Sequence, residues 1–131
     1  MTKLSSLSVF FPCFNEEKNI PLFVAEALKV LPSISRKFEI IIVNDGSGDN
    51  TLQVAQRLAK KHPEIVVVNH EKNRGYGASL RSGFSTAKYN WIFFTDGDLQ
   101  FRLDQLKEFI PHTEKSKAII GYRKHRADGT L

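Results

Sequence analysis

Short apolar runs alternate along this chain with segments in which apolar residues recur at helical spacing. Runs that are rich in β-branched or aromatic residues and end at polar or turn residues predict strands. The predicted strands are Leu7–Phe11, Phe38–Val43, Ile65–Val68, Trp91–Thr95 and Ala118–Gly121. The run Trp91–Phe94 is apolar at every position, which predicts a strand buried on both faces of its sheet.

The amphipathic segments between these runs predict helices. The first helix follows the loop 12–17, and we expect either Asn15 or Asn19 to cap it, with Pro21 in its first turn and Pro32 at its end. Its predicted buried stripe is Leu22, Ala25, Leu28 and Leu31. Later helices are expected with Leu52, Ala55, Leu58 and Ala59 on one face, from about Ala78 to Ala87, and around Leu103, Leu106, Phe109 and Ile110.

Strands that alternate with helices predict an α/β fold, a Rossmann-like and mostly parallel sheet flanked by helices. We expect residues 1–131 to form a single domain, because the sequence contains no repeat, linker or low-complexity segment. In sheets of this kind, ligands bind beyond the C-terminal ends of the strands. Clusters of polar residues follow several predicted strands, and the sequence therefore predicts a binding site where these loops converge.

Composition narrows the classes of partner. The chain has 131 residues, of which 41% are hydrophobic and 25% are charged, and its net charge is +5. This charge favours anionic partners such as nucleotides, phosphates or an acidic membrane face, whereas nucleic acid is disfavoured because no nucleic-acid-binding motif is present. No apolar run is long enough for a membrane helix, no signal peptide is evident, and a cytoplasmic setting is expected.

Asp96 and Asp98 directly follow the apolar run 91–94. In an extended segment, residues two apart point the same way, so both carboxylates can face one divalent cation, and Gly97 between them leaves room for a ligand. Mg²⁺ commonly takes one or two protein carboxylates and completes its shell with water and phosphate oxygens. The same three residues also suit a simple turn, so the motif alone leaves both interpretations open.

Two further loops carry acidic residues. Asp45 follows the second predicted strand and lies too early to cap the next helix comfortably, so we expect it to accept hydrogen bonds from a ribose or a base. Glu16 and Glu17 have a simpler explanation, since acids in the first turn of a helix interact favourably with its dipole. Cys13 is the single cysteine, which excludes an internal disulfide, and we expect it to be a small apolar filler.

The segment Arg74-Gly75-Tyr76-Gly77 offers a cation and small residues near a predicted helix N-terminus, which predicts a cradle for a diphosphate. It also resembles part of a dinucleotide-binding fingerprint. Leu80 stands where the third glycine of that fingerprint belongs, and several residues separate the loop from its strand. A nicotinamide-dependent oxidoreductase is therefore disfavoured.

Five segments together resemble glycosyltransferase family 2, whose fold is called GT-A. They cover nearly the whole chain in the family's order and are Phe11–Glu17, Val43–Thr51, Asn73–Ala78, Asp96–Gln100 and Gly121–Arg123. The nearest likeness is to the branch that moves a sugar from a nucleotide-sugar to a polyprenyl or dolichyl phosphate. That lipid acceptor implies work at the cytoplasmic face of a membrane.

The resemblance implies roles for the residues of the first two segments. Pro12, Phe14 and Glu16 would line the nucleotide pocket, while Val43 and Asp45 would contact the base and ribose.

The later segments would supply the reacting end of the site. Asp96 and Gly97 would contact the nucleotide-sugar, and the resemblance implies that Asp96 and Asp98 are the catalytic residues. Asp98 and Gln100 would approach a bound Mg²⁺ or Mn²⁺, and Arg123 would approach the diphosphate or the transferred sugar.

The resemblance implies a metal-dependent, inverting transfer of sugar from a nucleoside-diphosphate sugar to a polyprenyl phosphate. Catalytic domains of the family usually continue beyond the Gly-Tyr-Arg segment into an acceptor-binding half, which we do not find in these 131 residues. A nucleotide-sugar-binding fragment without transfer activity is therefore the alternative. We also expect an exposed sheet edge where that half would pack, which would favour self-association.

Overall fold

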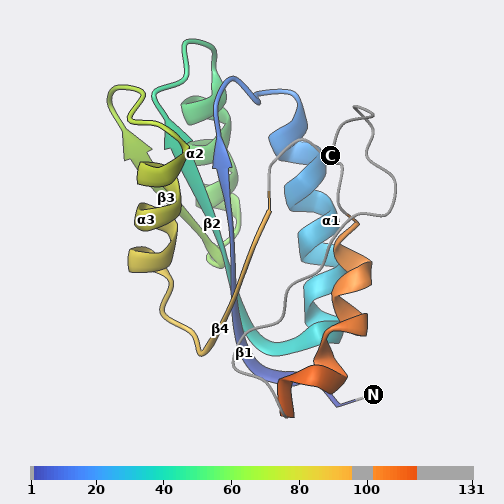
Figure 1. Ribbon diagram of the computed structural model, residues 1–131. Coiled ribbons are helices and arrows are strands. Elements are labelled where there is room, and N and C mark those ends of the chain that lie inside the picture. The colour runs from blue at the N-terminus through green and yellow to red at the C-terminus, as the bar shows by residue number, and fades with distance from the viewer. Residues whose placement is uncertain (1, 96–101, 115–131) are drawn as a thin grey trace, which may run out of the picture.

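The computed structural model describes residues 2–95 and 102–114 of the chain. Four parallel strands form one sheet in the order β3-β2-β1-β4 (Figure 1). The strands are β1 (Leu4–Cys13), β2 (Ser35–Asp45), β3 (Ile65–His70) and β4 (Trp91–Phe94). The helices are α1 (Asn19–Ile34), α2 (Thr51–Lys61), α3 (Tyr76–Thr86) and two short 3₁₀ helices, η1 (Leu103–Glu108) and η2 (Ile110–Glu114). The predicted α/β fold with a parallel sheet is confirmed.

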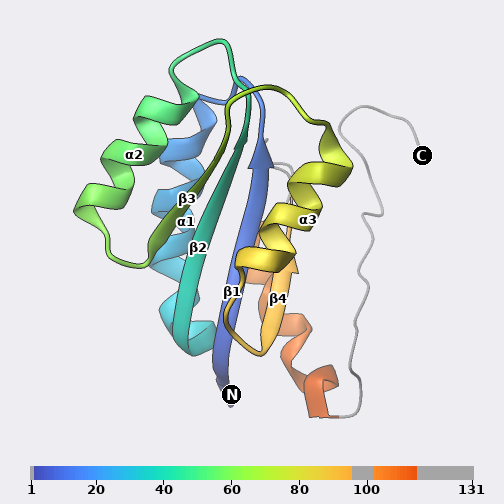
Figure 2. The same cartoon turned by 90° about the vertical axis from the view of Figure 1, so that its left-hand side faces the viewer.

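Helices cover both faces of the sheet, because successive residues of a strand point to opposite sides. Val9 and Phe11 of β1 join the larger hydrophobic core with residues of α1, α2 and the 3₁₀ helices, whereas Phe10 joins a smaller core beneath α3. Figure 2 shows α1 and α2 on one side of the sheet and α3 on the other. Helix α3 approaches closely at Gly83, where a Cβ atom would lie only 2.2 Å from Cδ1 of Phe10.

Strand β4 differs from its predicted environment. Trp91, Ile92 and Phe93 are only partly buried, and the Phe94 side chain is 39% exposed. Within the described sheet, β4 pairs with β1 alone and occupies an edge, so the prediction of a strand buried on both faces is wrong for these residues. Burial on both faces belongs instead to β1 and β2, the two inner strands.

Helix α1 buries only part of the predicted stripe, since Leu31 is fully buried and Leu28 packs against the larger core. Leu22 is 59% exposed and Ala25 is also exposed. The buried residues are Ile20, Phe23, Val24, Ala27, Leu31 and Ile34. This helix carries apolar residues around much of its circumference, so spacing alone permits more than one stripe, and packing against the sheet selects one.

The predicted boundaries of α1 are also corrected. Lys18 occupies the N-cap position without a side-chain hydrogen bond, so neither Asn15 nor Asn19 caps the helix. Pro21 lies in the first turn as expected, but Pro32 lies inside the helix, which continues to Ile34. Pro32 has no N–H to donate to the carbonyl of Leu28, so the last turn of α1 lacks one helical hydrogen bond.

The remaining elements follow the sequence pattern with smaller changes. Helix α3 begins at Tyr76 rather than Ala78, and the expected fourth helix consists of the two 3₁₀ helices, in which Leu103, Leu106 and Ile110 are buried. The predicted strand 118–121 lies outside the described residues. Among the helices of the described part, none combines the length and apolar character that crossing a bilayer requires.

Candidate functional site

Loops that follow β1 and β2 meet at the C-terminal edge of the sheet, as the sequence predicts. The Asn15 side chain joins them, since its Oδ1 accepts a hydrogen bond from the Gly48 N–H at 2.8 Å. The Asn15 N–H donates in turn to Ser47 Oγ at 3.0 Å, and the Glu16 N–H donates to Thr51 Oγ1 at 2.9 Å. Asn15 has a positive φ of 56°, a conformation that asparagine tolerates better than most residues. Its role is therefore to join two loops rather than to cap α1.

Asp45 connects the end of β2 to the glycine-containing loop before α3. Its Oδ1 accepts the Arg74 N–H at 2.8 Å and its Oδ2 accepts the Gly75 N–H at 3.0 Å. The neighbouring Gly46 has a φ of 67°, and a Cβ atom there would lie 2.2 Å from the Asn73 nitrogen. The Asp-Gly pair thus holds the loop 72–75 against the sheet edge.

His70 is a buried residue of this region that sequence reasoning missed. In the register of β2 and β3 it lies opposite Asp45, and its Nδ1 is 3.0 Å from Asp45 Oδ1. Its Nε2 lies 2.8 Å from Ser82 Oγ on α3. A proton on Nδ1 lets His70 donate to the carboxylate and accept the Ser82 hydroxyl proton. The sequence feature that could have indicated His70 is its position at the end of a strand rich in β-branched residues, just before the glycine-containing loop.

Hydrogen bonds keep two carboxylates of these loops ionised. Burial acts to raise the pKa of Asp45, but donors on Arg74, His70 and Gly75 outweigh it and hold that pKa below its usual value. Burial likewise acts to raise the pKa of Asp49, while bonds from Thr51 and from the Glu17 N–H lower it overall. Asp45 is therefore an anionic acceptor at neutral pH.

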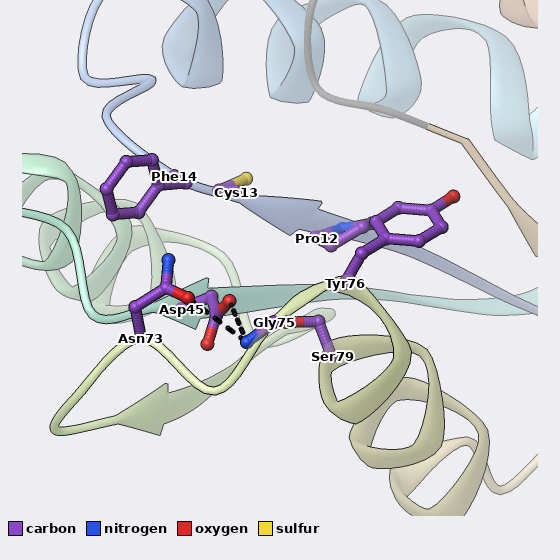
Figure 3. Close-up of a pocket in the computed structure, with 8 residues that line it drawn as sticks. All are labelled: Pro12, Cys13, Phe14, Asp45, Asn73, Gly75, Tyr76 and Ser79. Atoms are coloured by element: carbon purple, nitrogen blue, oxygen red, sulfur yellow. Dashed lines mark hydrogen bonds between the residues drawn. The ribbon is translucent and has the colours of Figure 1, made fainter.

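A cavity of about 230 Å³ opens beside Asp45 (Figure 3). Residues from the end of β1 and the loop after it, from the end of β2, and from the loop before α3 and the start of that helix line the cavity: Pro12, Cys13, Phe14, Asp45, Asn73, Gly75, Tyr76 and Ser79. Phe14 and Tyr76 are about half exposed, so aromatic surface remains open beside the cavity. A planar polar group can therefore contact apolar rings and a carboxylate at the same place.

The cavity brings together three of the residues that the resemblance assigns to the nucleotide pocket, Pro12, Phe14 and Asp45. Glu16 does not line it, and Glu16 Oε2 accepts a hydrogen bond from the Asn19 side chain at 2.7 Å. Val43 is fully buried in the core beneath α3. Asn73, Tyr76 and Ser79 also line the cavity, and the sequence pattern predicts no individual role for them. The feature of the sequence that could have indicated these residues is the glycine-containing segment, which runs directly into a helix.

The structure does not favour the glycine-containing loop before α3 as a diphosphate cradle. The backbone N–H groups of Arg74 and Gly75, which would receive a phosphate, already donate to the Asp45 carboxylate. A second anion placed there would face that carboxylate at close range, which is unfavourable. The geometry therefore favours a neutral ligand group beside Asp45.

The residues predicted to bind the metal, to be catalytic, or to contact the diphosphate and sugar lie outside the described part of the chain. These residues are Asp96, Gly97, Asp98, Gln100 and Arg123. Among residues 2–95 and 102–114, no group of three or more His, Cys, Asp or Glu side chains is arranged to hold a metal ion. A metal at Asp98 and Gln100 accordingly stays a prediction. Cys13 is buried in the larger core, in agreement with its predicted role as an apolar filler.

The loops, the cavity and the parallel sheet define a class of protein. The profile of glycosyl transferase family 2 matches residues 8–131, and the chain belongs to this family.

Individual relatives refine the class. The chain is 35% identical over 128 residues to a dolichyl-phosphate beta-glucosyltransferase of Trichomonas vaginalis, and the match covers 89% of this chain and 40% of the relative. It is 26% identical over 125 residues to an undecaprenyl-phosphate 4-deoxy-4-formamido-L-arabinose transferase of Proteus mirabilis, covering 93% of this chain and 38% of the relative. The chain thus spans about two fifths of the length of these proteins.

Solved structures share the fold over part of their length. S. aureus TarS in complex with UDP-GlcNAc matches with a TM-score of 0.69 and 27% identity, covering 84% of this chain and 31% of that one. A mannosyltransferase of Pyrobaculum calidifontis in complex with GDP-Man and Mn²⁺ matches with a TM-score of 0.70 and 22% identity, covering 81% and 31%. The sheet and its flanking helices are therefore those of GT-A transferases.

Proposed function

We propose that this chain is the nucleotide-sugar-binding part of a metal-dependent, inverting glycosyltransferase. The observation that supports this most strongly is the cavity at the C-terminal edge of the sheet, where an ionised Asp45 faces open aromatic surface. Asp45 accepts hydrogen bonds from the base or ribose, while Phe14 and Tyr76 contact the faces of the base. TarS, whose solved complex holds UDP-GlcNAc, supports a nucleotide-sugar as the ligand class.

The diphosphate belongs, in this proposal, to residues beyond β4. Asp96 and Asp98 come directly after β4 in the sequence, and Gln100 and Arg123 come further along the chain. When bound by Asp98 and Gln100, Mg²⁺ or Mn²⁺ would act as a Lewis acid and stabilise the charge that develops on the departing diphosphate. Asp96 and Gly97 contact the nucleotide-sugar, and Arg123 provides a further positive charge near the diphosphate or sugar.

The proposed acceptor is a polyprenyl phosphate. The two relatives compared above are named for transfer to dolichyl or undecaprenyl phosphate, which supports this acceptor class. A lipid phosphate is already anionic and attacks the sugar carbon without a strong general base. The net charge of +5 favours such a partner and a peripheral contact with an anionic membrane face.

The second candidate is a nucleotide-sugar-binding chain without transfer activity. The cavity beside Asp45 supports it as well, because binding a nucleotide in this cavity does not itself require transfer. An oxidoreductase is disfavoured by the structure as well as by the sequence, because residues 71–75 separate β3 from α3 and prevent the tight strand-to-helix turn of a dinucleotide fingerprint.

Calorimetric titration with UDP and GDP, with and without Mn²⁺, tests the proposed donor site. Metal-dependent binding of either nucleotide supports it, and binding of neither by the folded chain contradicts it. Sugar transfer to a short polyprenyl phosphate then separates the two candidates. No transfer at saturating donor and metal would leave binding as the function of this chain.

A further inference from the structure

Helix α3 carries an apolar stripe on its outer side. Tyr76, Leu80 and Phe84 are spaced four residues apart, so they share one face of the helix. Tyr76 is about half exposed, Phe84 is 45% exposed and Leu80 is partly buried. In Figure 2 the outer side of α3 faces the viewer, and no other described element covers it. Contiguous exposed apolar side chains of this kind mark an interaction surface.

Strand β4 extends the stripe. The ring centroids of Phe84 and Phe94 lie 5.5 Å apart in an edge-to-face arrangement, and both rings contact the buried ring of Phe10. Phe94 is exposed as well. Because Phe10 supports both rings from below, α3 and β4 together present one continuous aromatic surface.

Cations accompany these aromatic residues, and acids are absent from the same stretch of sequence. Residues 72–95 include no Asp or Glu and four basic residues, all of them exposed: Lys72, Arg74, Arg81 and Lys88. Arg74 precedes α3 and Lys88 follows it. Arg81 lies along the helix, with Nη1 3.6 Å from where a Cβ atom on Gly77 would be. Positive charge is therefore present at both ends of α3 and beside the stripe.

The strands beneath α3 do not neutralise this charge at the surface. Helix α3 packs on β1 and β2, and β1 has no acidic residue. The acids of β2 are Glu39 and Asp45, and both are buried. Glu39 accepts hydrogen bonds from Ser8 Oγ and from the Lys88 N–H, and Asp45 accepts those of the loop before α3. Both carboxylates are thus used inside the fold.

We propose that this face docks on a membrane that contains anionic phospholipids. We call it the α3 surface, and its residues are Arg74, Tyr76, Arg81, Phe84, Lys88 and Phe94. Aromatic rings suit the level of the lipid headgroups, and Arg and Lys can lay their apolar stems along the surface while their charges reach the phosphates. A second copy of this chain is a poorer occupant, because two α3 surfaces facing each other would bring like charges together.

Docking by the α3 surface would bring the candidate site to the membrane. Tyr76 belongs to the surface and also lines the cavity beside Asp45. Phe94 belongs to the surface and is the last residue of β4, which leads in the sequence to Asp96. The inference rests on the proposed function in one respect, because it places the chain where a polyprenyl phosphate acceptor would lie.

Co-sedimentation of the chain with lipid vesicles tests the inference. The vesicles contain phosphatidylcholine alone or phosphatidylcholine mixed with phosphatidylglycerol. We expect binding to the mixed vesicles to be at least about tenfold stronger, since several cations face the anionic lipid, and to weaken as salt is added.

Two matched pairs of variants locate the docking surface. Arg81→Gln should weaken binding to the mixed vesicles roughly fivefold, whereas Arg57→Gln, at an exposed arginine of α2 on the other side of the sheet, should have little effect. Phe84→Ala should weaken it by a similar factor of about five, and Leu22→Ala, at an exposed apolar residue of α1, should not. The Tm of each variant is measured, because Phe84 contacts Phe10 and Phe94. Arg81→Gln leaves those ring contacts in place and keeps the test independent of folding.

Equal effects of Arg81→Gln and Arg57→Gln would show that cations elsewhere in the chain carry the binding, and would overturn this inference. Equal binding to both kinds of vesicle, or binding to neither, would overturn it too. Self-association that Phe84→Ala abolishes would assign the surface to a second copy instead.

Titration of the same proteins with UDP and GDP separates this inference from the proposed function. Nucleotide binding without vesicle binding would overturn the docking surface and leave the proposed donor site intact. Vesicle binding that depends on Arg81 and Phe84, without nucleotide binding, would support the docking surface and contradict the donor site.

Discussion

His70 and Asp45 lie opposite each other at the ends of two neighbouring parallel strands, with 3.0 Å between Nδ1 and Oδ1. This contact joins the sheet to the glycine-containing loop through the carboxylate and to α3 through Ser82. His70 does not line the cavity, so it acts by positioning Asp45, which does.

Replacing His70 with Ala should destabilise the fold and weaken nucleotide binding together. The change removes two hydrogen bonds from buried or partly buried partners, which predicts a loss of about 1–3 kcal/mol in the free energy of unfolding. Urea denaturation measures it. His112→Ala, at an exposed position, is the control and should change stability by less than about 0.5 kcal/mol. Equal stability of the two variants would contradict the positioning role.

Asp45→Ala should weaken binding of the free nucleoside as well as of the nucleotide-sugar, because the proposed contact is with base or ribose. Loss of a hydrogen bond to a charged group predicts a reduction of roughly 10- to 100-fold. Calorimetry with the nucleoside and with its diphosphate sugar measures both affinities. An effect confined to the sugar-bearing ligand would place Asp45 away from the base and ribose.

Gly46→Ala should be strongly destabilising. The residue has a φ of 67°, and the added Cβ would lie 2.2 Å from the backbone nitrogen of Asn73. Strain and displacement of the loop predict a cost of at least about 2 kcal/mol in thermal or urea unfolding. Gly48→Ala is a matched control in the same loop, because the nearest atom would lie 4.0 Å from its Cβ. Similar stability of both variants would show that the loop adapts freely.

Acid should destabilise the fold through Asp45 and Asp49. Both have pKa values lowered by hydrogen bonds, so the unfolded chain binds more protons than the folded chain at mildly acidic pH. Their stabilising contribution is complete above about pH 5 and is lost as the pH falls through the unfolded value of about 3.9 toward the lower folded values. Urea midpoints measured from pH 7 to pH 3 should show a shallower acid decline in Asp49→Asn. Parallel curves for this variant and the unmodified chain would argue against the Asp49 contribution.

Asp98→Ala should reduce metal-dependent binding of the donor more than it affects folding, since we propose Asp98 as a metal ligand. The measurement is the ratio of UDP or GDP affinity with Mn²⁺ to that without it, alongside the Tm. A ratio equal to that of the unmodified chain would count against Asp98 as a ligand.

Much of the fold was predictable because it depends on local pattern. The runs 38–43 and 65–68 identified β2 and β3, and the alternation of strands with helices indicated a parallel sheet. Polar residues at strand ends indicated the edge where Asp45 and the loop 72–75 meet. The buried face of α1 was not predictable, because Leu22 and Val24 are both apolar and spacing alone cannot choose between them.

The sequence by itself determined the fold class, the family and the loops that carry polar chemistry, because each depends on residue types at short, readable spacings. The tertiary structure decided the strand order β3-β2-β1-β4 and the contacts of Asp45 with His70, 25 positions away, and with the Arg74 N–H, 29 positions away. It also decided that the Ser79 hydroxyl is buried without a protein partner among the described residues. The physical reason is that such contacts follow from how parallel strands align and how α3 packs on the sheet. Local periodicity carries no information about either.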